Sequence, residues 1–138
     1  MDLSNKKVLI TGGSSGLGKA MAKMLIEEGA KVAITGRDEE KLNEVAKSLG
    51  ARAIHADVTN ESDVKNCFDI MQNDLGGLDI LINNAGIGSN LKPVDEIDLD
   101  EMRRVFEVNV FGLALMGKTA AQIFKKQMSG DIVNIAST

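Results

Sequence analysis

The segment from Gly12 to Gly18 constrains this chain most, because its glycines follow a G-x-x-x-G-x-G spacing where a short apolar run ends and a helical pattern begins. Glycine allows a tight strand-to-helix turn and lets the backbone approach a ligand closely. The free N–H groups and dipole of a helix N-terminus favour a phosphate there, and Ser14 and Ser15 add hydroxyl donors. The alternative is a glycine-rich turn without a ligand, but the flanking strand and helix patterns favour a phosphate-binding loop.

Five short runs with strand propensity alternate with longer segments whose apolar residues recur at helical spacing. The predicted strands span 7–11, 31–35, 51–56, 79–82 and 131–136, of which the third is the weakest. Strands joined by helix-length connections pair in parallel, because a right-handed crossover lays each helix over a face of the sheet. The sequence therefore predicts a single α/β domain over 1–138 with a doubly wound parallel sheet.

Helical periodicity and capping residues predict where the connecting helices begin and end. Gly29 and Gly50 are predicted C-terminal stops, and Thr59 or Asn60 is a predicted N-cap. Asp98 and Glu101 form a capping-box pattern ahead of the longest helical segment. The apolar face predicted for the first helix comprises Leu17, Ala20, Met21, Met24 and Leu25.

Composition argues against several classes of function. The apolar-rich stretch 105–116 is interrupted by Glu107 and Asn109 and is shorter than the roughly 20 residues that span a bilayer, so we predict a buried helix and no membrane partner. A net charge of −4 without a basic stripe disfavours nucleic acid. Cys67 and His55 are the only residues of their types, so we expect no metal site and a reducing, cytoplasmic setting without a targeting segment.

The end of the second predicted strand carries Gly36, Arg37 and Asp38. In dinucleotide-binding sheets this position meets the adenosine ribose. Gly36 leaves room for a 2′-phosphate and Arg37 supplies a guanidinium for it, which favours NADP(H). The alternative is that Arg37 faces solvent while Asp38 caps a helix or binds the ribose, in which case NAD(H) is the cofactor.

Two more clusters follow predicted strands, at the edge of an open α/β sheet where ligands bind. Asp57 and Val58 follow the third strand, and the run Asn83-Asn84-Ala85-Gly86 follows the fourth. Each cluster alone is explained by a loop, a cap or a turn, because Asn and Gly tolerate left-handed backbone angles. Together with the glycine-rich segment they make a stronger pattern.

In chain order these motifs resemble the short-chain dehydrogenase/reductase family, and the resemblance spans the whole chain. It includes Asn109 within Val-Asn-Val-Phe-Gly and Ser137 at the end of Ile-Val-Asn-Ile-Ala-Ser. The resemblance implies a Rossmann fold with strand order 3-2-1-4-5 and a nicotinamide dinucleotide as cofactor. The cofactor-binding residues that it implies, together with the cofactor-choosing Arg37, are Gly12, Ser14, Ser15, Gly16, Leu17, Gly18, Arg37, Asp57, Val58, Asn84, Ala85 and Gly86.

The resemblance also implies catalytic roles. Ser137 matches the serine that hydrogen-bonds the reacting oxygen, and Asn109 matches the asparagine that supports a proton-relay water at a helix irregularity. The family's remaining catalytic pair is Tyr-x-x-x-Lys on the following helix, but the sequence contains no tyrosine and ends at Thr138. We therefore expect the N-terminal, cofactor-binding part of an oxidoreductase, inactive by itself, since the general acid is missing.

Three hypotheses remain at this point. The parent protein transfers hydride between NADP(H) and an alcohol or carbonyl, or the chain is a non-catalytic nucleotide-binding module, or it is a self-associating fragment with an empty glycine loop. Sugar, steroid, fatty-acyl and xenobiotic carbonyls all fit the first hypothesis. A fifth strand at the sheet edge and an uncovered face on the helix over 98–126 lead us to expect a homo-oligomer.

Overall fold

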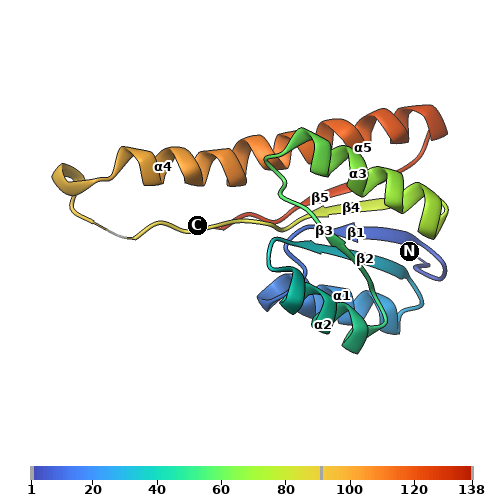
Figure 1. Ribbon diagram of the computed structural model, residues 1–138. Coiled ribbons are helices and arrows are strands. Elements are labelled where there is room, and N and C mark those ends of the chain that lie inside the picture. Colours follow the sequence, from blue (N-terminus) through green and yellow to red (C-terminus); the bar gives the residue numbers. More distant parts are fainter. Residues whose placement is uncertain (1, 91, 138) are drawn as a thin grey trace.

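The computed structural model describes residues 2–90 and 92–137, which form a sheet between two layers of helices (Figure 1). The strands are β1 (Lys7–Ile10), β2 (Lys31–Gly36), β3 (Arg52–His55), β4 (Ile80–Asn83) and β5 (Asp131–Asn134). The helices are α1 (Gly16–Glu27), α2 (Glu39–Leu49), α3 (Glu61–Ile70), α4 (Leu99–Phe106) and α5 (Leu113–Gln127). The π-helical turns η1 (Met71–Leu75) and η3 (Glu107–Gly112) and the 3₁₀ turn η2 (Val94–Glu96) complete the elements.

The sheet has five parallel strands in the order β3-β2-β1-β4-β5. This confirms the predicted doubly wound α/β fold and its strand order. β1 is central, so Leu9 has Ala33 as its register partner on one side and Leu81 on the other. Because all strands run in parallel, the loops that follow β1, β2, β3 and β4 meet at one edge of the sheet.

Successive side chains of β1 point to opposite faces of the sheet, and the core is divided in the same way into two clusters, one on each face. Val8 and Ile10 point towards α1 and α2, where they pack with Leu42. Leu9 points to the opposite face and packs with Phe68 of α3 and Met116 of α5. Figure 1 shows the same division, with α1 and α2 below the sheet and α3 and α5 above it.

Most predicted helix ends are confirmed. Gly50 ends α2 in a left-handed conformation with a φ of 76°, and the side chain of Asn60 caps α3 by accepting from the N–H of Asp63. The capping box at α4 is only half formed. Asp98 accepts from the N–H groups of Asp100 and Glu101, but the carboxylate of Glu101 accepts from the N–H of Asn90 instead of returning to the cap.

The apolar face predicted for α1 was wrong in part. The buried residues of this helix are Gly18, Ala22 and Leu25, whereas Leu17 and Met24 are more than half exposed. Gly18 sets the helix rotation, because a Cβ there would overlap the carbonyl oxygen of Gly12. The side without a Cβ can approach the loop most closely, and this turns Leu17 away from the core.

The prediction of a buried helix at 105–116 was also wrong in part. Val108, Gly112 and Met116 are buried, but Phe106 and Phe111 are 52% and 59% exposed. These two side chains are exposed because they lie at and just after the end of α4, which projects beyond the end of the sheet and has no buried residue (Figure 1).

Candidate functional site

The glycine-rich loop fits closely against β2 and the β4 loop. The N–H of Gly13 donates to the carbonyl oxygen of Thr35 at 2.9 Å, which holds the loop against β2. Gly12 has a φ of 66°, and a Cβ at this position would lie 2.9 Å from the Cα of Ala85. Neither a side chain nor an ordinary backbone conformation fits here, so glycine is required by both sterics and φ.

The N-terminus of α1 differs from those of α2, α3 and α4. Those three helices are capped by side chains, Asp38, Asn60 and Asp98, and each has acidic residues in its first turn. At α1, Ser15 occupies the N-cap without making a side-chain cap hydrogen bond, and the first turn contains no acidic residue. The first N–H groups of α1 therefore point into the loop region with their positive dipole uncompensated, as an anion site requires.

A hydrogen-bond network joins the loops that follow β1 and β4. The hydroxyl oxygen of Thr11, which is buried, accepts from the N–H groups of Asn84 at 3.0 Å and Ala85 at 2.9 Å. In return, the side-chain amide of Asn84 donates to the carbonyl oxygens of Thr11 and Gly12. The side chain of Asn84 is therefore used to fix the loop, and the backbone of this segment forms a wall of the site.

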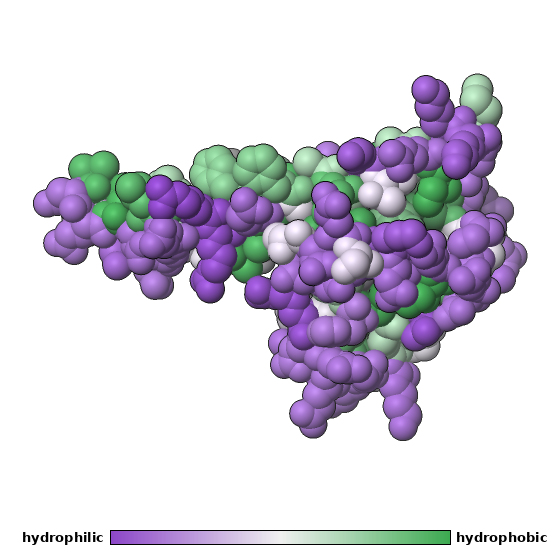
Figure 2. Space-filling model, turned by 45° about the horizontal axis from the view of Figure 1, so that its top comes forward, coloured by the Kyte–Doolittle hydropathy of each residue, from purple (hydrophilic) through white to green (hydrophobic). Residues whose placement is uncertain are grey.

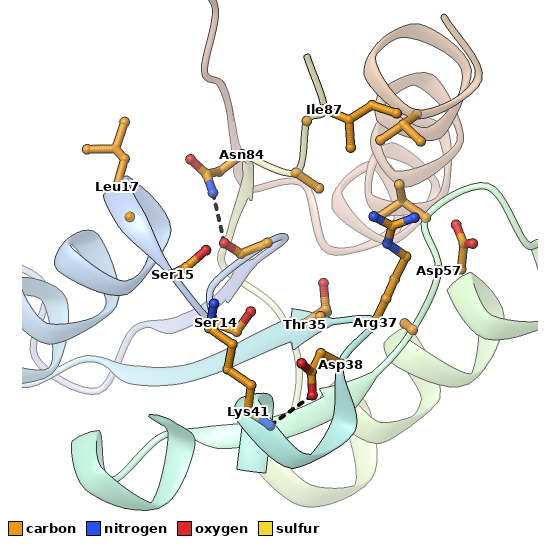
Figure 3. A pocket seen from close by; sticks show the side chains of 18 residues that line it. Ser14, Ser15, Leu17, Thr35, Arg37, Asp38, Lys41, Asp57, Asn84 and Ile87 are labelled. Atoms are coloured by element: carbon orange, nitrogen blue, oxygen red, sulfur yellow. Dashed lines mark hydrogen bonds between the residues drawn. The ribbon is translucent and has the colours of Figure 1, made fainter. Parts of the chain in front are cut away.

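These loops enclose a cavity of about 660 Å³ (Figure 3). The residues that line it are Gly12, Ser14, Ser15, Gly16, Leu17, Thr35, Gly36, Arg37, Asp38, Lys41, Ala56, Asp57, Val58, Asn84, Ala85, Gly86, Ile87 and Val108. Every residue predicted to bind the cofactor is among them except Gly18. Gly18 lies behind Gly12 and serves the site by close packing.

The end of β2 leaves little room for a larger side chain. A Cβ at Gly36 would lie 3.1 Å from the hydroxyl oxygen of Ser14, so a side chain there would require this hydroxyl to shift by a few tenths of an ångström. Asp38 caps α2 by accepting from the N–H of Lys41 at 3.0 Å. The carbonyl oxygen of Arg37 accepts from Nε2 of His55 at 2.8 Å, which ties this corner to the end of β3.

Asp57 lines the opposite side of the cavity from the glycine-rich loop (Figure 3). The N–H of Thr59 donates to its carboxylate at 2.9 Å, and this bond does most to hold the pKa of Asp57 below its ordinary value. Partial burial opposes the shift, whereas the hydroxyl of Thr59 and the charge of Arg37 add to it. Asp57 therefore presents a stable negative charge beside Arg37.

The two residues with expected catalytic roles lie outside the cavity lining. Asn109 is half-buried in the π-helical turn η3, so the expected helix irregularity is present at this residue. Its side-chain amide donates to the carbonyl oxygen of Ile87 and accepts from the N–H of Ile87, each at 2.8 Å. Ser137 is exposed and lies three residues beyond the end of β5. Their roles in catalysis stay predictions.

Sequence reasoning missed several lining residues. Lys41 lies in the first turn of α2, and its position three residues after a capping aspartate would have placed it near the cavity. Ile87 and Val108 supply an apolar wall opposite the loop, and their only sequence signal was proximity to motif residues.

The described residues provide no metal site, no reactive thiol and no membrane-spanning helix. Across residues 2–90 and 92–137, no group of three or more His, Cys, Asp or Glu side chains is placed to hold a metal ion. Burial raises the pKa of the Cys67 thiol to about 12, which keeps it protonated and unreactive. In the same part of the chain, no helix is long and apolar enough to cross a membrane.

Comparison with known proteins gives a consistent result. Residues 6–138 match the family model for the short chain dehydrogenase. The chain is 40% identical over 99% of its length to zerumbone synthase from Zingiber zerumbet, and 41% identical over 98% to secoisolariciresinol dehydrogenase from Forsythia intermedia. It spans about half the length of these relatives, 53% and 50% respectively.

A solved structure gives the same relationship in three dimensions. The crystal structure of a 3-ketoacyl-(acyl-carrier-protein) reductase from Brucella melitensis, complexed with NADH, has a TM-score of 0.93 and 38% identity. The match covers 98% of this chain and 58% of that one. With its parallel sheet, glycine-rich loop and sheet-edge cavity, the chain belongs to the short-chain dehydrogenase family.

Proposed function

We propose that this chain is the cofactor-binding part of an oxidoreductase that uses NADP(H) in preference to NAD(H) and acts on an alcohol or carbonyl substrate. The bound dinucleotide supplies the hydride or accepts it. The chain's own residues bind and orient that cofactor. We expect no turnover from these 138 residues alone, because the tyrosine that the family resemblance assigns to acid–base chemistry is not among them.

The observation that carries this proposal is the uncapped N-terminus of α1 at the mouth of the cavity. Gly12, Gly13 and Gly18 let the loop pack closely, because a Cβ at these positions would overlap Ala85, Ile34 and the carbonyl oxygen of Gly12 respectively. This packing holds the first N–H groups of α1 at the cavity, where they can bind an anion. The cavity extends from there to the end of β3, where Asp57 and Val58 form the far wall. A pyrophosphate at the loop end and a base at the β3 end suit this arrangement of lining residues.

The preference for NADP(H) rests on the end of β2. Gly36 places no carboxylate against a ribose 2′-hydroxyl, and Ser14 borders the space that such a side chain would occupy. Arg37 adds a cation to the cavity lining. One oxygen of Asp38 is already used to cap α2, which weakens the case that this carboxylate binds the ribose.

The substitution Ser15→Asp tests the phosphate site. An aspartate at the N-cap stabilises α1 by about 0.5–1 kcal/mol, because it supplies the missing cap and a favourable charge. The same carboxylate repels a phosphate, so NADPH affinity measured by calorimetry should fall roughly tenfold or more. Ser129→Asp, at the opposite edge of the sheet, is the matched control and should change neither affinity nor α1 stability.

Unchanged NADPH affinity in Ser15→Asp would contradict the proposed site. Turnover of any carbonyl by the rigorously purified, unsubstituted 138-residue chain would contradict its proposed inactivity.

We propose that the partner of this chain is a second copy of itself. The observation that favours this is the apolar face of α4 and η3, where Phe106, Val110 and Phe111 are each about half exposed. Figure 2 shows apolar atoms gathered along the projecting end of the molecule, bordered by polar groups. An exposed apolar surface with a polar rim is typical of association sites.

A further inference from the structure

The end of the molecule that projects beyond the sheet carries both apolar and acidic side chains on η2 and α4 (Figure 1). Five large apolar side chains are exposed between Val94 and Phe106. The same segment has five carboxylates and two arginines, a net charge of −3, whereas the net charge of the whole chain is −4. Figure 2 shows hydrophobic and hydrophilic residues side by side on this end. None of the residues that line the nucleotide cavity belongs to this segment, so its surface is free for another role.

A groove of about 270 Å³ lies beside α4. Its apolar lining comprises Ile97, from the segment that precedes α4, and Met102, Val105 and Phe106 of the helix itself. The three helical residues are spaced i, i+3 and i+4, so they share one face of α4. Such a face suits a second helix, because the side-chain ridges of one helix pack into the grooves of another.

Carboxylates border this groove, and most of them have no ion-pair partner. Asp98 and Glu101 line it, and each accepts from backbone N–H groups, which leaves its negative charge in place. In the part of the chain that the structure describes, Asp100 with Arg103 is the only ion pair between 94 and 106. Lys92 is the one cation among the described residues that line the groove. Acidic groups therefore outnumber basic ones, and the groove attracts a cationic partner.

We propose that this groove is a docking site for a basic amphipathic helix of another protein. The apolar face of that helix packs on Ile97, Met102 and Phe106, and its lysine or arginine side chains lie against the bordering carboxylates. Charge complementarity favours this occupant over the projecting end of a second copy, which would bring the same net charge of −3. The face proposed for self-association is a neighbouring one, because Val110 and Phe111 do not line the groove.

The probe that tests this proposal is a synthetic helix of leucine and lysine with a single tryptophan on its apolar face. The chain contains neither tryptophan nor tyrosine, so the tryptophan emission reports on the peptide alone. Titration with the 138-residue chain should shift this emission to the blue as the ring leaves water, with an affinity that falls as salt is added. A helix of leucine and glutamate with the same tryptophan has the opposite charge and should not bind.

Two variants separate the charged and apolar parts of the groove. Asp95→Lys combined with Glu96→Lys reverses two charges in η2 and should weaken binding of the leucine–lysine helix roughly tenfold at low salt. Met102→Gln removes an apolar side chain from the groove and should weaken binding by about threefold to tenfold. Glu39→Lys combined with Glu40→Lys makes the same change of charge in the first turn of α2, and this matched control should leave binding unchanged.

Three outcomes would overturn the proposal. They are the absence of a blue shift with the unsubstituted chain, equal binding of the leucine–glutamate helix, and unchanged affinity in both groove variants. If Met102→Gln weakens self-association in sedimentation equilibrium but leaves the peptide affinity unchanged, a second copy is the occupant instead. Circular dichroism establishes that each variant is folded, and the two groove variants are independent tests, since they change separate elements.

Discussion

β4 and β5 are neighbouring parallel strands of equal length, yet their side chains lie in opposite environments. All four residues of β4 are buried, and Leu81 is completely inaccessible to solvent. All four residues of β5 are exposed, although Ile132 is the register partner of Leu81. Strand pairing satisfies the backbone groups of β5 that face β4, but only layers on both faces of the sheet bury side chains.

The same contrast holds for the helices. α1, α2, α3 and α5 each bury apolar residues against the sheet, whereas α4 buries none and ends in an exposed apolar face. Most of the candidate nucleotide site lies at the well-covered end of the molecule, between the loops of β1 to β4. η3 also contributes to it, because Val108 lines the cavity and Asn109 forms hydrogen bonds to Ile87.

The largest effect is expected when an isoleucine is replaced by alanine in the covered part of the sheet, and the same substitution in β5 provides the comparison. Ile10→Ala, in β1, removes a completely buried side chain and should lower the free energy of unfolding by about 3 kcal/mol. Ile132→Ala, in β5, changes a side chain that is 40% exposed and should cost less than about 1 kcal/mol. Urea denaturation measures both. Equal losses would show that β5 is covered in solution, and a dependence on protein concentration would identify a second copy as the cover.

Two helical glycines, Gly18 in α1 and Gly117 in α5, test how closely the backbone is packed at the nucleotide site and away from it. Gly18→Ala should destabilise the chain by about 1–3 kcal/mol and abolish nucleotide binding, because the new methyl group overlaps the backbone of Gly12. Gly117→Ala, within α5, should stabilise it by up to about 1 kcal/mol, since the nearest atom to its Cβ is 3.9 Å away, on Asn83. Thermal unfolding and NADPH titration report on both. A tolerated methyl group at Gly18 would contradict the close packing of the loop.

The exposed face of α4 and η3 provides the third test. Phe111→Gln should weaken self-association by about 1–2 kcal/mol, because it removes apolar surface from the proposed interface between copies. Met24→Gln, on α1, removes a similarly exposed apolar side chain and should leave association unchanged. Sedimentation equilibrium measures the dissociation constant. If the unsubstituted 138-residue chain is monomeric at all concentrations, the proposal that its partner is a second copy is ruled out.

Local signals in the sequence predicted the parallel α/β sheet and the glycine-rich loop, whereas the family resemblance implied the strand order and many of the residues that line the cavity. Strand and helix patterns determine which loops meet at one sheet edge, and glycine spacing marks the loop that approaches phosphate. The rotation of α1 was not predictable in this way. Apolar residues lie on more than one side of this helix, and contact between Gly18 and Gly12 decides which side is buried.

The exposure of Phe106 and Phe111 was missed for a related reason. Periodicity indicates that a segment has an apolar face, but it carries no information about whether another layer lies opposite that face. Lys41 was missed for a different reason, because its position three residues after the capping Asp38 was a local signal that was not used.

The smallest expected effect lies at Asp57, on the cavity wall of the well-covered region. Because its pKa is lowered below the ordinary 3.8 in the folded chain, Asp57 stabilises the fold above that value, and the contribution is lost as pH falls through the folded pKa. Asp57→Asn should therefore flatten the decline in stability below about pH 4. Thr59→Val keeps the backbone N–H that contributes most and should preserve most of the decline. If Thr59→Val flattens the curve as much as Asp57→Asn, the hydroxyl of Thr59 is the dominant donor instead.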